Sequence, residues 1–83
     1  MFSFDIKKAA DIAATVKSVE YKIKNSGGRF SGDEKSGSFI NRAGDIAGNY
    51  LVGANNIKIT ITKKPFIYPD SIVESKIREY FEQ

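Results

Sequence analysis

The chain has 83 residues, enough for one domain with a small core, and it contains neither cysteine nor histidine. Disulfides and thiolate chemistry are therefore excluded, and so are the usual general base near neutral pH and the commonest transition-metal ligand. Thirteen basic and ten acidic side chains give a net charge of +3, a mild and scattered excess that is not typical of nucleic-acid binders. We expect a single domain over residues 1–83 with no metal or cofactor.

The apolar residues of the chain are spread over short segments. No run approaches the roughly 20 residues that a membrane-spanning helix needs. The N-terminal residues 1–4 lack the basic region and long apolar core of a signal peptide. The sequence therefore predicts a cytoplasmic protein with no membrane partner.

The first predicted element is a helix over residues 5–25. Asp5 lies where a negative charge favours a helix start, and the run Asn25-Ser26-Gly27-Gly28 is typical of a helix end. Apolar side chains recur at three- and four-residue steps, which is the spacing of a helix that buries one face. They are Ile6, Ala9, Ala13, Val16, Val19 and Ile23.

Residues 29–64 predict a four-stranded antiparallel meander. Strands are expected at 29–32, 37–41, 46–52 and 57–64, separated by turns rich in glycine, asparagine and aspartate. Apolar and polar side chains alternate along the last two strands, as in a sheet with one buried face. With each turn centred on its middle residues, two inward rows result: Phe30, Phe39, Gly48 and Ile61, then Gly32, Gly37, Tyr50 and Ile59. Apolar residues then align across all four strands, which supports this register.

The segment after the last strand leads into a second helix. Pro65 ends the strand, and we expect the aromatic run containing Phe66 to cover the edge of the core. Ser71 and Glu74 have the spacing of a capping box, which predicts a helix that ends near Phe81. Its expected buried stripe is Ile72, Val73, Ile77, Tyr80 and Phe81. The predicted fold class is α+β in the order α-β-β-β-β-α, a four-stranded antiparallel meander with two helices packed on one face.

The chain shows no pattern typical of a catalytic site. Residues 28–36 contain glycines, a lysine and a serine, but two acidic residues interrupt the spacing of a phosphate-binding loop. Asp33, Glu34 and Asp45 are expected at turns that do not bring them together. We therefore predict that the protein is not an enzyme and has no catalytic residues.

The outward face of the predicted sheet is the first candidate binding surface. A small apolar patch rimmed by one lysine and two threonines is expected there: Ile40, Ala47, Leu51, Lys58, Thr60 and Thr62. The patch favours docking of a protein partner or of a second copy, and a merely solvated face is the alternative. Nucleic acid is not expected, because Phe30, Phe39 and Tyr50 point inward and cannot stack on bases.

The groove between the helices and the sheet is the second candidate. An apolar ligand there would contact Phe39, Tyr50, Ile59 and Phe66, in the manner of small helix-grip proteins. The alternative is that these side chains simply fill the core, because a domain of this size has little apolar material to spare. A carrier of a small apolar ligand is therefore the second functional hypothesis.

The order of elements resembles the granule-region family of polyhydroxyalkanoic-acid-system proteins. The similar features are a leading amphipathic helix, a hairpin between Gly32 and Gly37, an alternating strand at 57–62 and a final helix at 71–81. The chain departs from that family because its helices are not rich in arginine and glutamate. The resemblance implies a small cytoplasmic accessory protein near polyhydroxyalkanoate storage granules, and it carries over no catalytic residue. We therefore expect a non-catalytic accessory or interaction protein.

Overall fold

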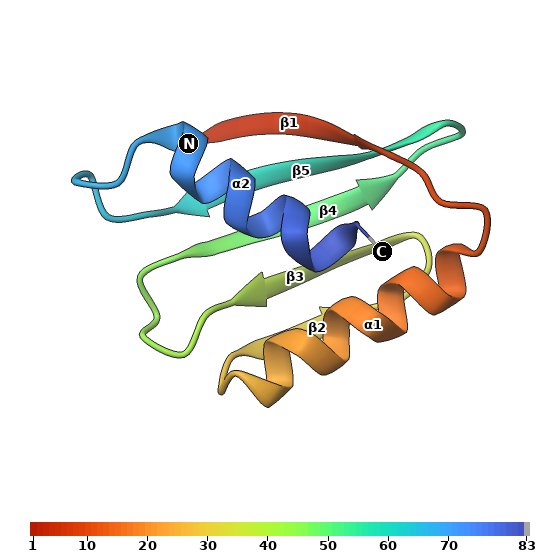
Figure 1. Cartoon of the computed structure of the whole chain (residues 1–83), viewed down its shortest axis with the longest axis horizontal. Coiled ribbons are helices and arrows are strands. Elements are labelled where there is room, and N and C mark those ends of the chain that lie inside the picture. The colour runs from red at the N-terminus through yellow and green to blue at the C-terminus, as the bar shows by residue number, and fades with distance from the viewer. Residues whose placement is uncertain (83) are drawn as a thin grey trace.

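The computed structural model describes residues 1–82, which form a five-stranded antiparallel sheet and two helices (Figure 1). The strands are β1 (Phe2–Lys7), β2 (Arg29–Gly32), β3 (Ser36–Ile40), β4 (Ala47–Val52) and β5 (Asn56–Lys63). The helices are α1 (Ile12–Asn25) and α2 (Asp70–Phe81). The strand order is β1-β5-β4-β3-β2. Strands β2 to β5 are the predicted meander, and β1 adds a fifth strand beside β5.

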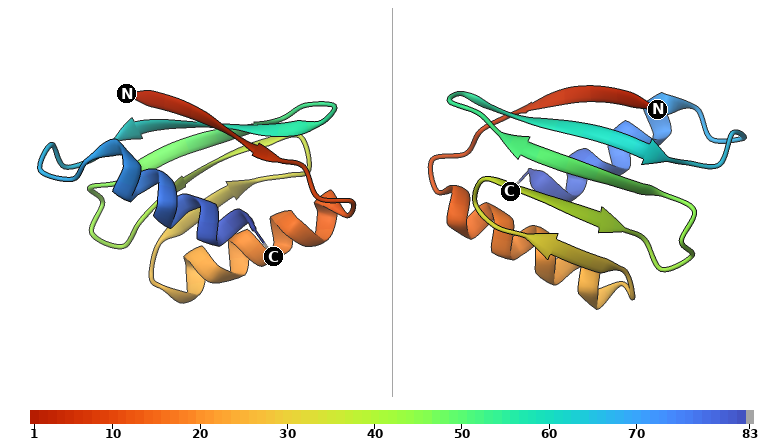
Figure 2. Two further views of the ribbon diagram at one scale, coloured as in Figure 1. Left: turned by 45° about the horizontal axis from the view of Figure 1, so that its top comes forward. Right: turned by 180° about the vertical axis from the view of Figure 1, so that it is seen from behind.

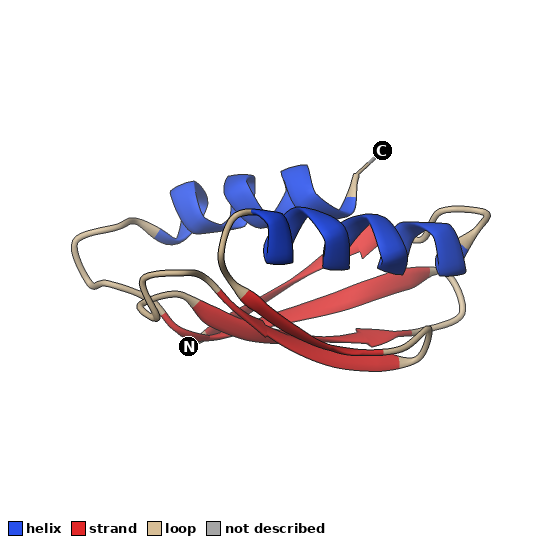
Figure 3. Ribbon diagram, turned by 90° about the horizontal axis from the view of Figure 1, so that it is seen from below, coloured by secondary structure: helices blue, strands red, loops and turns tan. Residues whose placement is uncertain are grey.

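Both helices lie on the same face of the sheet, which confirms the predicted α+β class and its layers (Figure 3). Helix α1 packs beside β2, and α2 packs against α1 and β1. The view from behind shows the other sheet face, over which no helix of the described residues passes (Figure 2, right). The protein therefore has one covered and one open sheet face.

The predicted strand register is confirmed in all three hairpins. Phe30 lies opposite Phe39, and Phe39 lies opposite Gly48. Gly48 in turn lies opposite Ile61. The second inward row is also as predicted: Gly32, Gly37, Tyr50 and Ile59. A shift by one residue would turn every buried side chain toward water, which is why the alternation specifies the register.

The N-terminal segment forms a strand, so the predicted helix start at Asp5 is wrong. Phe4 and Ile6 face the helices and lie opposite isoleucines of β5. Helix α1 begins after Asp11, whose Oδ1 accepts a hydrogen bond from the N–H of Ala14 at 3.1 Å. Ile6 fits both the period of the strand and the apolar spacing of the following helix. The edge of β5 favours the strand over the helix, because its free backbone groups can form hydrogen bonds along the whole length of β1.

Helix α2 begins too early for the predicted capping box, which is therefore wrong. Pro69 is the N-cap residue and makes no side-chain capping bond, so Ser71 already lies inside the first turn. Glu74 accepts a hydrogen bond from Nε of Arg78 at 2.9 Å instead. The predicted helix over residues 71–81 agrees with the observed Asp70–Phe81 to within one residue.

The buried stripe of α2 is narrower than predicted. Val73, Ile77 and Phe81 are buried, as expected. Tyr80 is half-buried, and Ile72 is 57% exposed, so its predicted place in the core is wrong. Neighbouring residues on a helix point about 100° apart, and only Val73 of the adjacent pair can face the sheet.

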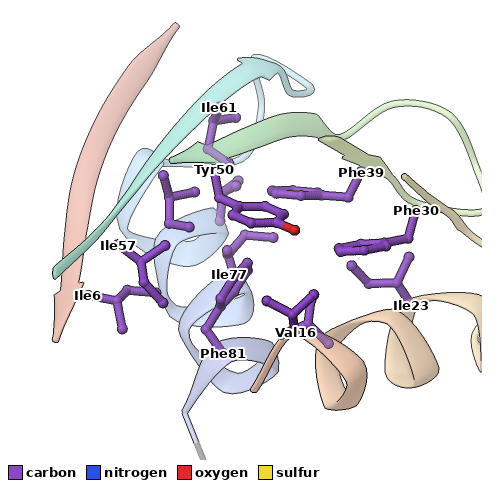
Figure 4. Close-up of a cluster of buried hydrophobic side chains, with 13 residues drawn as sticks. Ile6, Val16, Ile23, Phe30, Phe39, Tyr50, Ile57, Ile61, Ile77 and Phe81 are labelled. Atoms are coloured by element: carbon purple, nitrogen blue, oxygen red, sulfur yellow. The ribbon is translucent and has the colours of Figure 1, made fainter. Parts of the chain in front are cut away.

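Aromatic rings occupy the middle of the core (Figure 4). The ring of Tyr50 lies 5.9 Å from that of Phe30 and 5.7 Å from that of Phe81, centre to centre. It also lies directly against the backbone of the β2–β3 hairpin. A Cβ atom at Gly37 would be 2.5 Å from Tyr50 Cε1, and one at Gly32 would be 2.5 Å from its Oη. The two glycines are therefore required by the ring that crosses them.

Candidate interaction surfaces

The open sheet face is centred on a row of neutral polar side chains. The register places these side by side across the five strands, in the order Ser3, Thr60, Asn49, Ser38 and Ser31. The hydroxyl oxygens of Ser3 and Thr60 are 3.1 Å apart. Short polar residues on one face are typical of an antiparallel sheet that is open to water on that side.

The predicted interaction residues all lie on this open face, but they do not form one apolar patch. Ile40 and Ala47 are opposite one another and half-buried at one end of the sheet. Leu51 is 60% exposed and lies opposite Lys58, beyond the polar row. Asn49 separates Ala47 from Leu51 along β4, so the structure brings Ile40 and Ala47 together and leaves Leu51 apart from them.

The predicted groove between the helices and the sheet is occupied by packed side chains. Phe39, Tyr50 and Ile59 belong to the buried core, but Phe66 is 93% exposed, so its predicted place in the lining is wrong. The pocket between the sheet and helices beside Phe39 and Ile77 has a volume of about 20 Å³. Small-molecule sites are typically about 300–1,000 Å³. This groove therefore does not supply the volume that the carrier hypothesis requires.

A strongly exposed apolar segment connects β5 to α2. We call residues 65–69 the apolar turn. Within it Phe66 is 93% exposed, Ile67 68% and Tyr68 43%. Ile72, in the first turn of α2, is exposed as well. Single exposed apolar residues are common on protein surfaces, but a consecutive group marks a candidate binding site.

The apolar turn is held in place by polar contacts of its backbone. The N–H of Tyr68 donates to the carbonyl oxygen of Pro65 at 3.1 Å. Nζ of Lys64 donates to the carbonyl oxygen of Tyr68 at 2.8 Å and lies 3.3 Å from Oδ1 of Asp70. The exposed side chains therefore project from an ordered turn.

Sequence reasoning missed this site because it treated the hydrophobicity of residues 66–68 as evidence of burial. The segment lacks the alternation or helical spacing that would have aimed its side chains at the core. Pro65 and Pro69 on either side were the available signal, because prolines bracket turns more often than buried elements.

The sheet end next to the apolar turn is basic. Arg29 lies opposite Ile40, Ile40 lies opposite Ala47, and Ala47 lies opposite Lys63. This row of paired residues therefore begins with Arg29 on β2 and ends with Lys63 on β5. Thr62 of the predicted face is exposed next to Lys63. The β3–β4 loop and the apolar turn extend from the same end in both views (Figures 1 and 2). Cationic and apolar groups are therefore gathered at one end of the molecule.

At the opposite end of the sheet, the pKa values of Asp33 and Tyr50 differ from the usual values of these groups. The N–H groups of Lys35 and Ser36 donate to Oδ1 of Asp33 at 2.8 and 3.1 Å and lower the pKa of its carboxyl group. Burial raises the pKa of Tyr50 to about 12, and the negative charges of Asp33 and Glu20 contribute in the same direction. Formation of the hairpin and packing of the core account for both shifts.

These observations define a small α+β protein with an open antiparallel sheet, an apolar turn and a basic end. Comparisons of the chain with family models, with curated proteins and with solved structures found no match. Within residues 1–82, no three acidic side chains are grouped so that they could hold a metal ion. In the same part of the chain, no helix is long and apolar enough to cross a membrane.

Proposed function

We propose that this chain is a non-catalytic accessory protein that attaches to an apolar surface through its apolar turn. The supporting observation is the exposure of Phe66 and Ile67 in a turn that Lys64 holds in place. The resemblance to the granule-region family suggests which surface this is. That surface is the aliphatic polyester of a polyhydroxyalkanoate granule.

A protruding turn is physically suited to a surface of this kind. A soft apolar phase needs no complementary pocket in the partner, and attachment depends mainly on the apolar area removed from water. Burial of Phe66 and Ile67 would contribute about 1.5–3 kcal/mol each. The two side chains together would therefore control attachment.

A binding assay on amorphous polyhydroxybutyrate particles tests the proposal. The wild-type chain is expected to sediment with the particles, and the double variant Phe66→Ser/Ile67→Ser is expected to bind at least about a hundredfold more weakly. Both side chains are exposed in the folded protein, so the variant should keep its circular dichroism spectrum and melting temperature.

Leu51→Ser is the matched control, because Leu51 is 60% exposed but lies on the open sheet face. Its particle binding should equal that of the wild type. Equal binding by the double variant and the wild type would refute the proposal. A loss with Leu51→Ser as large as that of the double variant would move the attachment site to the open face.

A further inference from the structure

A small pocket at the basic end of the sheet contains two arginines. It lies where the connection from α1 to β2 meets the β3–β4 loop, and its volume is about 240 Å³. Its lining consists of Gly27, Arg29, Ile40, Asn41, Arg42 and Gly44. We propose that this pocket binds a phosphate group. The proposal is independent of the apolar turn and would stand if the turn had no role in attachment.

The side chain of Arg42 lies directly against the backbone of the α1–β2 connection. A Cβ atom at Gly27 would be 2.8 Å from Cδ of Arg42, and the positive φ of 93° at Gly27 also favours glycine there. The glycine thus provides the space in which the arginine stem is seated. Arg29 reaches the same pocket from the first residue of β2.

The loop that carries Arg42 is preorganised by one asparagine. Oδ1 of Asn41 accepts hydrogen bonds from the N–H groups of Gly44, Asp45 and Ile46 at 3.0–3.1 Å. Nδ2 of Asn41 donates to the carboxylate of Asp45 at 2.8 Å. The loop therefore presents Arg42 from a fixed backbone, and Asp45 is engaged within the loop.

Neither Arg29 nor Arg42 takes part in an ion pair within the described residues. The ion pairs among residues 1–82 use Lys24, Lys64 and Arg78 as their cations. Arg42 is also not needed to cap α1. The carbonyl groups of its last turn, residues 22–24, accept hydrogen bonds from the N–H groups of Ser26, Gly28 and Gly27.

Two arginines that line one pocket match the chemistry of a phosphate group. Each can donate two parallel hydrogen bonds to its oxygens, and two positive charges balance a dianion. The group could be free phosphate, a phosphorylated small molecule or a lipid headgroup. Arg29 and Lys63 stand three strand spacings apart, about 14 Å, at the sheet end from which the apolar turn extends.

Titration with inorganic phosphate, followed by NMR of the whole chain, tests the pocket. We expect saturable shifts at the amides of Gly27 and Gly44 and at the Nε–H groups of both arginines. Arg29→Gln and Arg42→Gln should each weaken binding about ten- to hundredfold. Lys35→Gln, a loss of the same charge at the opposite hairpin, should leave it unchanged. Shifts without saturation, or equal weakening by Lys35→Gln, would overturn the proposal.

Flotation with vesicles distinguishes the source of the phosphate. The vesicles contain phosphatidylcholine with or without about one third phosphatidic acid. Retention on phosphatidic acid that both arginine variants lose would identify a headgroup. Arginine-dependent binding of inorganic phosphate without vesicle retention would identify a free phosphate compound. Absence of arginine-dependent binding in both assays would refute the site, and neither result bears on the polyester assay of the double variant at Phe66 and Ile67.

Discussion

Tyr50 links the core to the β2–β3 hairpin through both parts of its side chain. Its ring occupies the space that Gly32 and Gly37 leave open, and the residue is 2% exposed. Its hydroxyl donates to the carbonyl oxygen of Asp33 at 2.6 Å. The same hydroxyl is held away from water, and this raises its pKa to about 12. Tyr50 thus packs in the core, donates a hydrogen bond to the hairpin and has a raised pKa.

The titration of Tyr50 predicts a loss of stability at alkaline pH. The folded pKa is about 12, above the usual value of 10, so the contribution is complete below pH 10 and is lost as the pH rises toward 12. The unfolding free energy should fall by about 2 kcal/mol across this window because of Tyr50.

Tyr50→Phe is the matched variant, since it removes the titration and keeps the ring. At pH 8 it should be about 1 kcal/mol less stable, through the loss of the bond to Asp33. Urea unfolding at pH 8, 10 and 12 measures the difference in unfolding free energy between the two proteins. Other titrating groups contribute equally to both proteins, so their effects cancel in this difference. A difference that does not change with pH would contradict this account.

At the scale of elements, the two helices start by different means. Asp11 caps α1 through a side-chain hydrogen bond to the N–H of Ala14. Helix α2 starts at Pro69, whose fixed φ suits a helix entrance and whose carbonyl accepts from Ile72 at 3.1 Å. The start of α1 therefore depends on the carboxylate of Asp11, and the start of α2 depends on the backbone geometry of Pro69.

This contrast gives a paired prediction. Asp11→Ala should lower the unfolding free energy by about 1 kcal/mol, because the first turn of α1 loses its side-chain acceptor. Ser71→Ala should change it by less than about 0.5 kcal/mol, because Ser71 makes no capping bond. Thermal and urea unfolding measure both. A larger effect at Ser71 than at Asp11 would restore the capping box that the structure lacks.

At the scale of the whole molecule, the two ends of the chain are joined through Arg78. Its Nη2 donates to the carbonyl oxygen of Asp5 at 3.0 Å, and its guanidinium lies 5.3 Å from the ring centre of Phe4. Glu74 orients the side chain through its contact at Nε. Arg78 thereby occupies a backbone acceptor of the edge strand β1, which limits pairing with other chains.

Removal of Arg78 should loosen β1 while leaving the meander intact. Arg78→Ala is expected to cost about 1 kcal/mol and to speed amide hydrogen exchange at Phe4 and Ile6. Lys76→Ala is the control, because Lys76 is an exposed cation of the same helix that lies over the ring of Tyr80. Equal exchange at β1 in the wild type and in Arg78→Ala would show that the edge is held without the arginine.

The meander and its register could be predicted from the sequence. Apolar and polar side chains alternate along the last two strands, and the tight turns link neighbouring strands, so each pairing depends on residues close together in the chain. The extent of α2 and the inward orientation of Phe39, Tyr50 and Ile59 follow from the same local patterns.

Only the tertiary structure decided the features that join distant parts of the chain. Residues 2–7 became a strand because the edge of β5, 49 to 59 residues away along the chain, offered them hydrogen bonds. The apolar turn is exposed because the helices and sheet had already filled the core, which left Phe66 no space inside. The arginine pocket forms because two loops meet at one sheet end. Local patterns specify pairings within a hairpin. Which apolar segments become buried depends instead on competition among all segments of the chain.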